Sequence, residues 1–225
     1  MTSMGKSKFD TCFFERYAQI CLETLLGDAY KALVNEDRPD LQMPDHSLGI
    51  EVTRAMEPKK DVAQDLLKEM AGFEVPEEDK AEVDQIIKSG YGYGLQNGKY
   101  IGQLEYEYWS LAQPLRRIIE SKVHKVGSGF YGEFDEYGLY IFCKDDLTEE
   151  EVLMTIDYTC DLQRNLDIKY SKMYLSLIDK LYVCDLNASD HVSGPTKCAS
   201  HEIPPGMRRL FFMQAFIGNV AKNGW

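Results

Sequence analysis

Residues 38–55 read RPDLQMPDHSLGIEVTRA, and this stretch decides the fold. Proline, aspartate, histidine and serine at residues 44–47 favour a four-residue turn. The residues that follow alternate between apolar and polar side chains, as a half-buried strand does. We therefore predict a β-hairpin whose register places Asp40 opposite Glu51.

The predicted register brings two carboxylates to one face of the hairpin. It pairs Leu41 with Ile50, and it turns Ile50 and Val52 toward the core. Opposed side chains of an antiparallel pair have Cβ atoms about 4.5–5.5 Å apart, so Asp40 and Glu51 repel each other unless a cation lies between them. A hard ion such as Mg²⁺ takes one or two carboxylates and keeps several waters. We expect Asp40, Glu51 and the Val52 carbonyl to bind Mg²⁺, with Mn²⁺ as a substitute; the alternative is a solvent-exposed acidic hairpin.

The same stretch resembles the catalytic hairpin of the PD-(D/E)xK, or restriction endonuclease-like, superfamily. It is most similar to bacterial members that carry PD(L/F), a turn and then GIEVT. Pro39 and Asp40 match the PD element, and residues 51–53 occupy the (D/E)xK element. The resemblance implies an αβββαβ core and Mg²⁺-dependent cleavage of phosphodiester bonds. Thr53 replaces the lysine that would orient water and stabilise the charge of the pentavalent phosphate.

A second segment resembles the family in a way that would replace this lysine. Residues 118–142, IIESKVHKVGSGFYGEFDEYGLYIF, are similar to the I-x-x-K-x-x-K segment and following strand of GIEVT-type members. Lys122 and Lys125 lie three residues apart and share a helix face, so either is a candidate. A solvated helix end, where positive charge complements the dipole, is the alternative. Members of the superfamily often add a glutamate from the first helix; Glu15 and Glu23 are candidates, and the interval to the hairpin favours Glu15.

The remaining patterns predict one α/β (α+β) domain over residues 1–225, with a restriction endonuclease-like core whose central mixed sheet is flanked by helices. Residues 57–103 are expected to form a helical and loop insertion. Helices are expected at residues 9–35 with an interruption at Gly27, from Pro114 to about 126, at about 149–165 behind a capping box of Thr148 and Glu151, and at about 169–178. Strands are expected at 137–142 and 180–186, a polar loop at 187–205, and a strand or a helix at 210–217.

Composition limits the classes of function. The 225 residues carry a formal net charge of −12, which counts against broad non-specific binding of nucleic acid. It does not exclude a nuclease, because bound ions neutralise a carboxylate site. The sequence has no apolar run of the roughly 20 residues that a membrane span needs and no apolar stretch typical of a signal peptide at its beginning. We expect a cytoplasmic protein that does not bind membranes.

Two functions remain open from the sequence. The first is a Mg²⁺-dependent nuclease acting on DNA, with RNA as the alternative substrate. In it the two hairpin carboxylates bind metal, one of the two lysines stabilises transition-state charge, one of the two glutamates completes the site, and a metal-bound water is the nucleophile. The second is a catalytically inactive nuclease-fold protein that acts as a binding or regulatory partner. The missing strand lysine and the net charge favour the second; the acidic pair favours the first. A homodimer or a protein partner is compatible with both.

Overall fold

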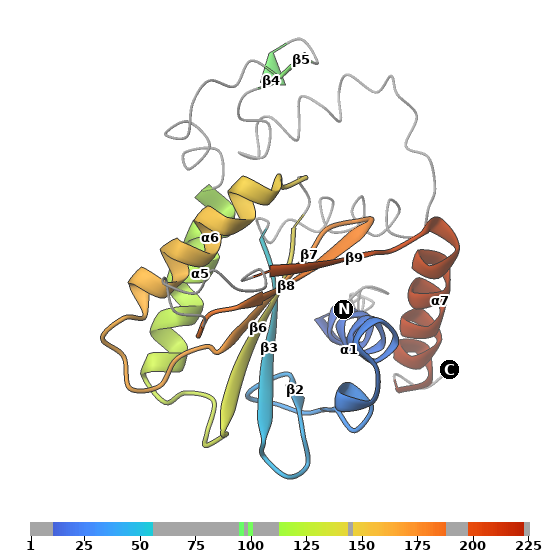
Figure 1. Ribbon diagram of the computed structural model, residues 1–225. Helices are drawn as coiled ribbons and strands as arrows, with labels where there is room; N and C mark the ends of the chain where they lie inside the picture. The colour runs from blue at the N-terminus through green and yellow to red at the C-terminus, as the bar shows by residue number, and fades with distance from the viewer. Residues whose placement is uncertain are drawn as a thin grey trace, which may run out of the picture.

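One mixed sheet organises the part of the chain that the structure describes, with strand order β1-β2-β3-β6-β7-β8-β9 (Figure 1). The computed structural model describes residues 11–55, 95–96, 99–100, 113–143, 146–187 and 198–222. The strands are β1 (Val34–Asn35), β2 (Leu41–Gln42), β3 (Leu48–Arg54), β6 (Glu136–Phe142), β7 (Lys172–Ser176), β8 (Lys180–Asp185) and β9 (Cys198–Glu202). β3 runs parallel to β6 and β6 parallel to β7, whereas the other neighbours are antiparallel. The predicted α+β class with a central mixed sheet is confirmed.

Helices cover both faces of this sheet (Figure 1). They are α1 (Thr11–Leu26), the short 3₁₀ helix η1 (Gly27–Tyr30), α5 (Gln113–Gly127), α6 (Glu149–Leu162) and α7 (Pro205–Lys222). α1 and α7 pack together on one face, and α5 and α6 lie on the other. No helix in the described ranges combines the length and the hydropathy that crossing a lipid bilayer requires.

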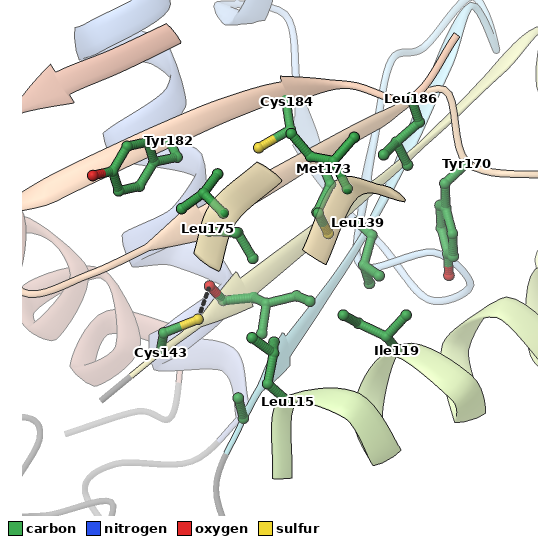
Figure 2. Packing of buried hydrophobic residues seen from close by; sticks show 14 of the residues in the cluster. Leu115, Ile119, Leu139, Cys143, Tyr170, Met173, Leu175, Tyr182, Cys184 and Leu186 are labelled. Atoms are coloured by element: carbon green, nitrogen blue, oxygen red, sulfur yellow. Dashed lines mark hydrogen bonds between the residues drawn. The ribbon is translucent and has the colours of Figure 1, made fainter. Parts of the chain in front are cut away.

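The side chains of β6 alternate between two hydrophobic cores. Tyr140 and Phe142 belong to the core under α1 and α7, whereas Leu139 and Ile141 belong to the core under α5 and α6. Figure 2 shows the second core, where Ile119 of α5 points toward Leu139. Burying one such aliphatic side chain stabilises the fold by about 1.5–3 kcal/mol, so the second core fixes α5 against the sheet.

The predicted hairpin is confirmed in its register. Leu41 pairs with Ile50 and Gln42 with Gly49, and the Met43 amide donates to the Leu48 carbonyl at 2.8 Å. Ile50 is fully buried in the core under α1, as predicted for its face of the strand. The turn is therefore four residues long, and it sets which side chains of β3 face α5.

Gly49 allows Pro39, the first residue of the PD element, to pack directly on β3. A Cβ atom at this position would stand 2.7 Å from Cγ of Pro39 and about 3.0 Å from the ring of Phe134. These approaches are shorter than real Cβ contacts. Glycine at this position lets Pro39 pack on β3, which places the following residue, Asp40, beside the strand.

Several predicted boundaries are wrong. The predicted interruption at Gly27, which has a φ of +78°, is confirmed, but the first α-helix ends there at Leu26 and no α-helix continues to residue 35. The predicted helix at 169–178 is instead β7, a central strand between β6 and β8. Its middle residues are buried because helices cover both faces of the sheet. The predicted loop at 187–205 contains β9, an edge strand of polar composition. The run at 210–217, left open between strand and helix, belongs to α7.

Other predictions about the elements are confirmed or lie outside the described residues. Thr148 and Glu151 form the reciprocal capping box that begins α6, and β6 and β8 occupy the predicted strands. Most of the predicted insertion at 57–103 lies outside the described residues. Its described part is a two-stranded antiparallel pair, β4 (Leu95–Gln96) and β5 (Lys99–Tyr100).

Candidate active site

Lys122 of α5 and Glu51 of β3 form a close ion pair. Lys122 Nζ lies 2.5 Å from Glu51 Oε1, and the two side chains are only 14% and 10% exposed. Because Ile50 and its alternate neighbours point to the α1 face, Glu51 points to the face that α5 covers. The structure therefore brings one of the two candidate lysines to the predicted carboxylate site.

Asp40 is held against β3 by its side chain. Its Oδ2 atom accepts a hydrogen bond of 2.7 Å from the backbone N–H of Val52. In an antiparallel ladder this N–H belongs to the same series as that of Ile50 and points toward β2. The register places Pro39 opposite Val52, and the Asp40 carboxylate, instead of a backbone carbonyl of β2, accepts the hydrogen bond from the Val52 N–H. A side-chain carboxylate thus replaces one backbone hydrogen bond between the two strands of the hairpin.

The two carboxylates interact electrostatically. Burial raises the pKa of Asp40 to about 7, and the neighbouring charge of Glu51 adds to the increase. The Val52 hydrogen bond and the Lys122 ammonium oppose this change in pKa. Ionising Asp40 beside Glu51 is therefore unfavourable, and a further positive charge at the site would favour the ionised form.

Glu15, from α1, lies at the same site. Its side chain is 7% exposed, and its Oε2 accepts a hydrogen bond of 2.8 Å from Asn35 Nδ2. The same Asn35 amide also donates to the Asp40 backbone carbonyl at 3.1 Å. Glu23, the other candidate, instead accepts from the Gln19 side chain at 3.0 Å. Of the two glutamates, Glu15 is the one joined to the Asp40 segment.

Lys125 occupies a different place from Lys122. Its Nζ atom lies over the ring of Phe130, 4.9 Å from the centroid. The Arg38 guanidinium lies over the same ring at 5.2 Å. Lys125 and Arg38 therefore both contact the Phe130 ring, whereas Lys122 contacts the Glu51 carboxylate.

Three side chains at the site were not predicted from the sequence: Asn35, Tyr131 and Tyr170. Tyr131 is 2% exposed, and among the described residues its hydroxyl has no hydrogen-bond partner. Burial and then the nearby charge of Glu51 raise the pKa of Tyr131. Tyr170 extends from the sheet toward α5 (Figure 2) and donates a hydrogen bond of 3.3 Å to the Lys122 carbonyl. The sequence offers no pattern that distinguishes these residues from ordinary core polar groups.

The donor set suits a hard divalent cation. Within the described ranges no group of three or more histidine, cysteine, aspartate or glutamate side chains is arranged to hold a metal ion. Mg²⁺ does not need such a group, because it takes one or two carboxylates and keeps several waters. In the contacts above each carboxylate uses one oxygen, Oδ2 of Asp40 and Oε1 of Glu51. The second oxygen of each and the raised pKa of Asp40 fit a small cation.

The site combines the buried carboxylates of Glu51 and Glu15, the half-buried carboxylate of Asp40, a lysine and a buried tyrosine hydroxyl. These groups come from α1, the hairpin, α5 and the segment after α5, so the whole first half of the described fold contributes. Searches against protein-family models, curated proteins and solved structures found no match for this chain.

Proposed function

We propose that the protein is a cytoplasmic, Mg²⁺-dependent nuclease of the PD-(D/E)xK kind that hydrolyses phosphodiester bonds in DNA. The observation that carries the proposal is the 2.5 Å contact between Lys122 Nζ and Glu51 Oε1. Thr53 leaves the strand without the lysine of the motif, and Lys122 supplies an ammonium at the motif's second carboxylate from the neighbouring helix. Apart from the 3₁₀ helix η1 and the separate β4–β5 pair, the elements follow the order α1, β1, β2, β3, α5, β6. This order supports the proposal, since it matches the αβββαβ order that the resemblance implies.

Asp40, Glu51 and the Val52 carbonyl would hold the metal ion. The Val52 carbonyl belongs with its N–H to the series of backbone groups directed toward β2. Pro39 has no N–H to donate to it, so this carbonyl lies on the Asp40 side of β3 with no ladder donor opposite. When bound, Mg²⁺ polarises a phosphoryl oxygen and lowers the pKa of a coordinated water.

The chain's own residues then have separable tasks. Lys122 holds the Glu51 carboxylate in one orientation and places a positive charge where negative charge develops on the phosphate. Glu15 orients Asn35, whose amide holds the Asp40 backbone. The buried Tyr131 hydroxyl provides a donor beside Glu51 for a water or a phosphoryl oxygen.

A paired measurement of metal binding and cleavage tests the proposal. The wild-type protein is melted in EDTA and in Mn²⁺, and plasmid and single-stranded DNA are incubated with Mg²⁺ or Mn²⁺. At about 100 times its dissociation constant, Mn²⁺ should raise the free energy of unfolding by about 2.7 kcal/mol. Asp40→Asn and Glu51→Gln should abolish both this stabilisation and cleavage.

Two glutamates on one helix provide a matched control. Glu15→Gln should weaken Mn²⁺ stabilisation and cleavage, whereas Glu23→Gln should leave both unchanged, because Glu23 contacts only Gln19 among the partners described above. Equal effects of the two variants would contradict the assignment of Glu15. Metal stabilisation that depends on Asp40 and Glu51 but is accompanied by no cleavage of any nucleic acid would support the rival, a nuclease-fold protein with a binding or regulatory role.

A further inference from the structure

The ring of an exposed phenylalanine contacts two cations. The Phe130 side chain is 45% exposed. The Arg38 guanidinium lies 5.2 Å from the ring centroid, and Lys125 Nζ lies 4.9 Å from it. Exposed aromatic rings next to two positive charges offer a base a stacking surface and offer phosphates a counter-charge.

The end of α5 holds Phe130 in position. Gly129 has a φ of +70°, its N–H donates to the Val126 carbonyl at 3.0 Å, and the Phe130 N–H donates to the Lys125 carbonyl at 3.4 Å. This pattern is the Schellman motif, in which a glycine in the left-handed region ends a helix. The motif fixes the Phe130 backbone directly beside Lys125.

Three connections tie this cluster to the proposed active site. Phe130 contacts Tyr131 edge to face, with ring centroids 5.4 Å apart, and the Tyr131 hydroxyl is buried near Glu51. Lys125 lies three residues beyond Lys122, on a neighbouring part of the same helix. Arg38 is two residues before Asp40 in the sequence. The cluster therefore lies at the outer end of a path of side chains that leads to the carboxylates.

We propose that Arg38, Lys125 and Phe130 form a nucleotide platform, on which Phe130 stacks against an unpaired base and the two cations contact the adjacent phosphates of a single strand. The inference deepens the proposed function by naming its substrate class, and it rests on that function. Stacking requires a free base face, which a duplex does not present within its interior. A chain of net charge −12 also favours a ligand bound partly by stacking over one bound by phosphate contacts alone.

The energies allow a nucleotide to replace the contacts that Phe130 and Arg38 make in the free protein. Each cation gains about 0.5–1 kcal/mol from the ring when exposed, whereas stacking a base on an aromatic side chain contributes about 1–3 kcal/mol. Arg38 also lies 3.4 Å from Asp37, with side chains 61% and 85% exposed. Such an exposed pair contributes little, so a phosphate can take the place of Asp37.

Binding without cleavage tests the platform. Fluorescein-labelled dT12, U12 and a 12-base-pair duplex are titrated with protein in EDTA, and affinity is followed by fluorescence anisotropy. Phe130→Ala should weaken binding of dT12 or U12 by about tenfold or more, and Phe130→Trp should retain it. The double variant Arg38→Gln/Lys125→Gln should reduce the slope of log affinity against log salt by about 1.4, since each phosphate contact on a single strand contributes about 0.7.

Matched controls come from α6 and the segment after it. Leu162 is 37% exposed and Arg164 forms an exposed pair with Asp161, so Leu162→Ala and Arg164→Gln should bind as the wild type does. The platform is overturned if the wild type binds neither single strand, if Phe130→Ala binds both unchanged, or if it loses duplex binding equally. Because binding is measured without metal, loss of the platform with cleavage retained, or cleavage absent with the platform intact, separates the two proposals.

Discussion

Lys122 and Glu51 meet across the interface between a helix and a strand, 71 residues apart in the sequence. Their side chains are nearly buried, so each charge depends on the other for the interactions that water would otherwise provide. The pair joins α5 to β3 at the position where the hairpin motif lacks its own lysine. Its contribution to stability can be measured independently of any activity.

Lys122→Met should destabilise the protein strongly in EDTA at pH 8. Methionine keeps an unbranched apolar stem but leaves Glu51 buried without its partner, which costs about 3 kcal/mol. The double variant Lys122→Met/Glu51→Gln should recover most of this loss. Denaturant unfolding measures both, and Lys31→Met, which removes the exposed Lys31–Asp28 pair, should change stability by no more than about 0.5 kcal/mol. Equal losses in the single and double variants would contradict the pairing.

The pKa of Asp40 predicts how stability depends on pH. Burial and the charge of Glu51 raise this pKa to about 7, whereas the unfolded chain keeps a value of about 3.9. Between these values the folded state holds a proton that the unfolded state has lost. The contribution of Asp40 to the free energy of unfolding is therefore fully present below about pH 4. It decreases by up to about 1.4 kcal/mol per pH unit as the pH rises from 4 to 7, and above pH 7 it is lost.

Asp40→Asn removes this dependence, because asparagine can still accept the Val52 hydrogen bond without carrying a charge. In EDTA we expect the variant to become progressively more stable than the wild type as the pH rises from 4 to 7, and to remain so at pH 8. Thermal unfolding at matched pH values measures the difference. Asp167→Asn, at an exposed position, is the control, and parallel curves for Asp40→Asn and the wild type would rule out the raised pKa. Saturating Mn²⁺ should reverse the order at pH 8, since the metal stabilises only the wild type.

The site was predictable where sequence spacing alone sets geometry. The register of the hairpin follows from the turn and the alternation, so the positions of Asp40 and Glu51 could be inferred. The choice between the lysines was also present in the sequence. At about 100° per residue, Lys122 lies about 40° from the centre of the apolar stripe of Leu115, Ile118, Ile119 and Val123, whereas Lys125 lies about 100° away. Only the first can reach the sheet that the stripe covers.

The contributions of Asn35 and Tyr131 could not be predicted, because they depend on how distant segments pack. Asn35 lies in β1, a strand of two residues that is too short to show a periodic pattern in the sequence. Tyr131 enters the site because the turn after α5 directs it inward. The error at β7 has a related cause: its run of buried residues shows no alternation, since helices cover both faces of the sheet, and such a run resembles a buried helix.

Gly49→Ala tests whether the Pro39 contact positions Asp40. The added methyl group would meet Pro39 Cγ at 2.7 Å, and relieving this overlap should cost about 1–3 kcal/mol of stability. Movement of Pro39 should also displace Asp40 and weaken stabilisation by Mn²⁺. Gly206→Ala is the control, because nothing lies within 4 Å of a Cβ atom at that position; it should be neutral or stabilising by up to about 1 kcal/mol. Unchanged metal stabilisation in Gly49→Ala would show that Asp40 is positioned without the Pro39 contact.

Tyr131→Phe separates a role in function from a role in stability. Among the described residues, the buried hydroxyls of Tyr131 and Tyr140 both lack hydrogen-bond partners, and such a group costs about 1–3 kcal/mol. Tyr140 lies in the core on the opposite face of the sheet, away from Glu51, so Tyr140→Phe is a matched control. Both variants should be at least as stable as the wild type. Only Tyr131→Phe should lower kcat, by about 100-fold if its hydroxyl donates to the reacting phosphate or its water, with KM unchanged because the residue is buried. If both variants gain stability and neither loses activity, Tyr131 is an ordinary core residue and the donor must come from elsewhere.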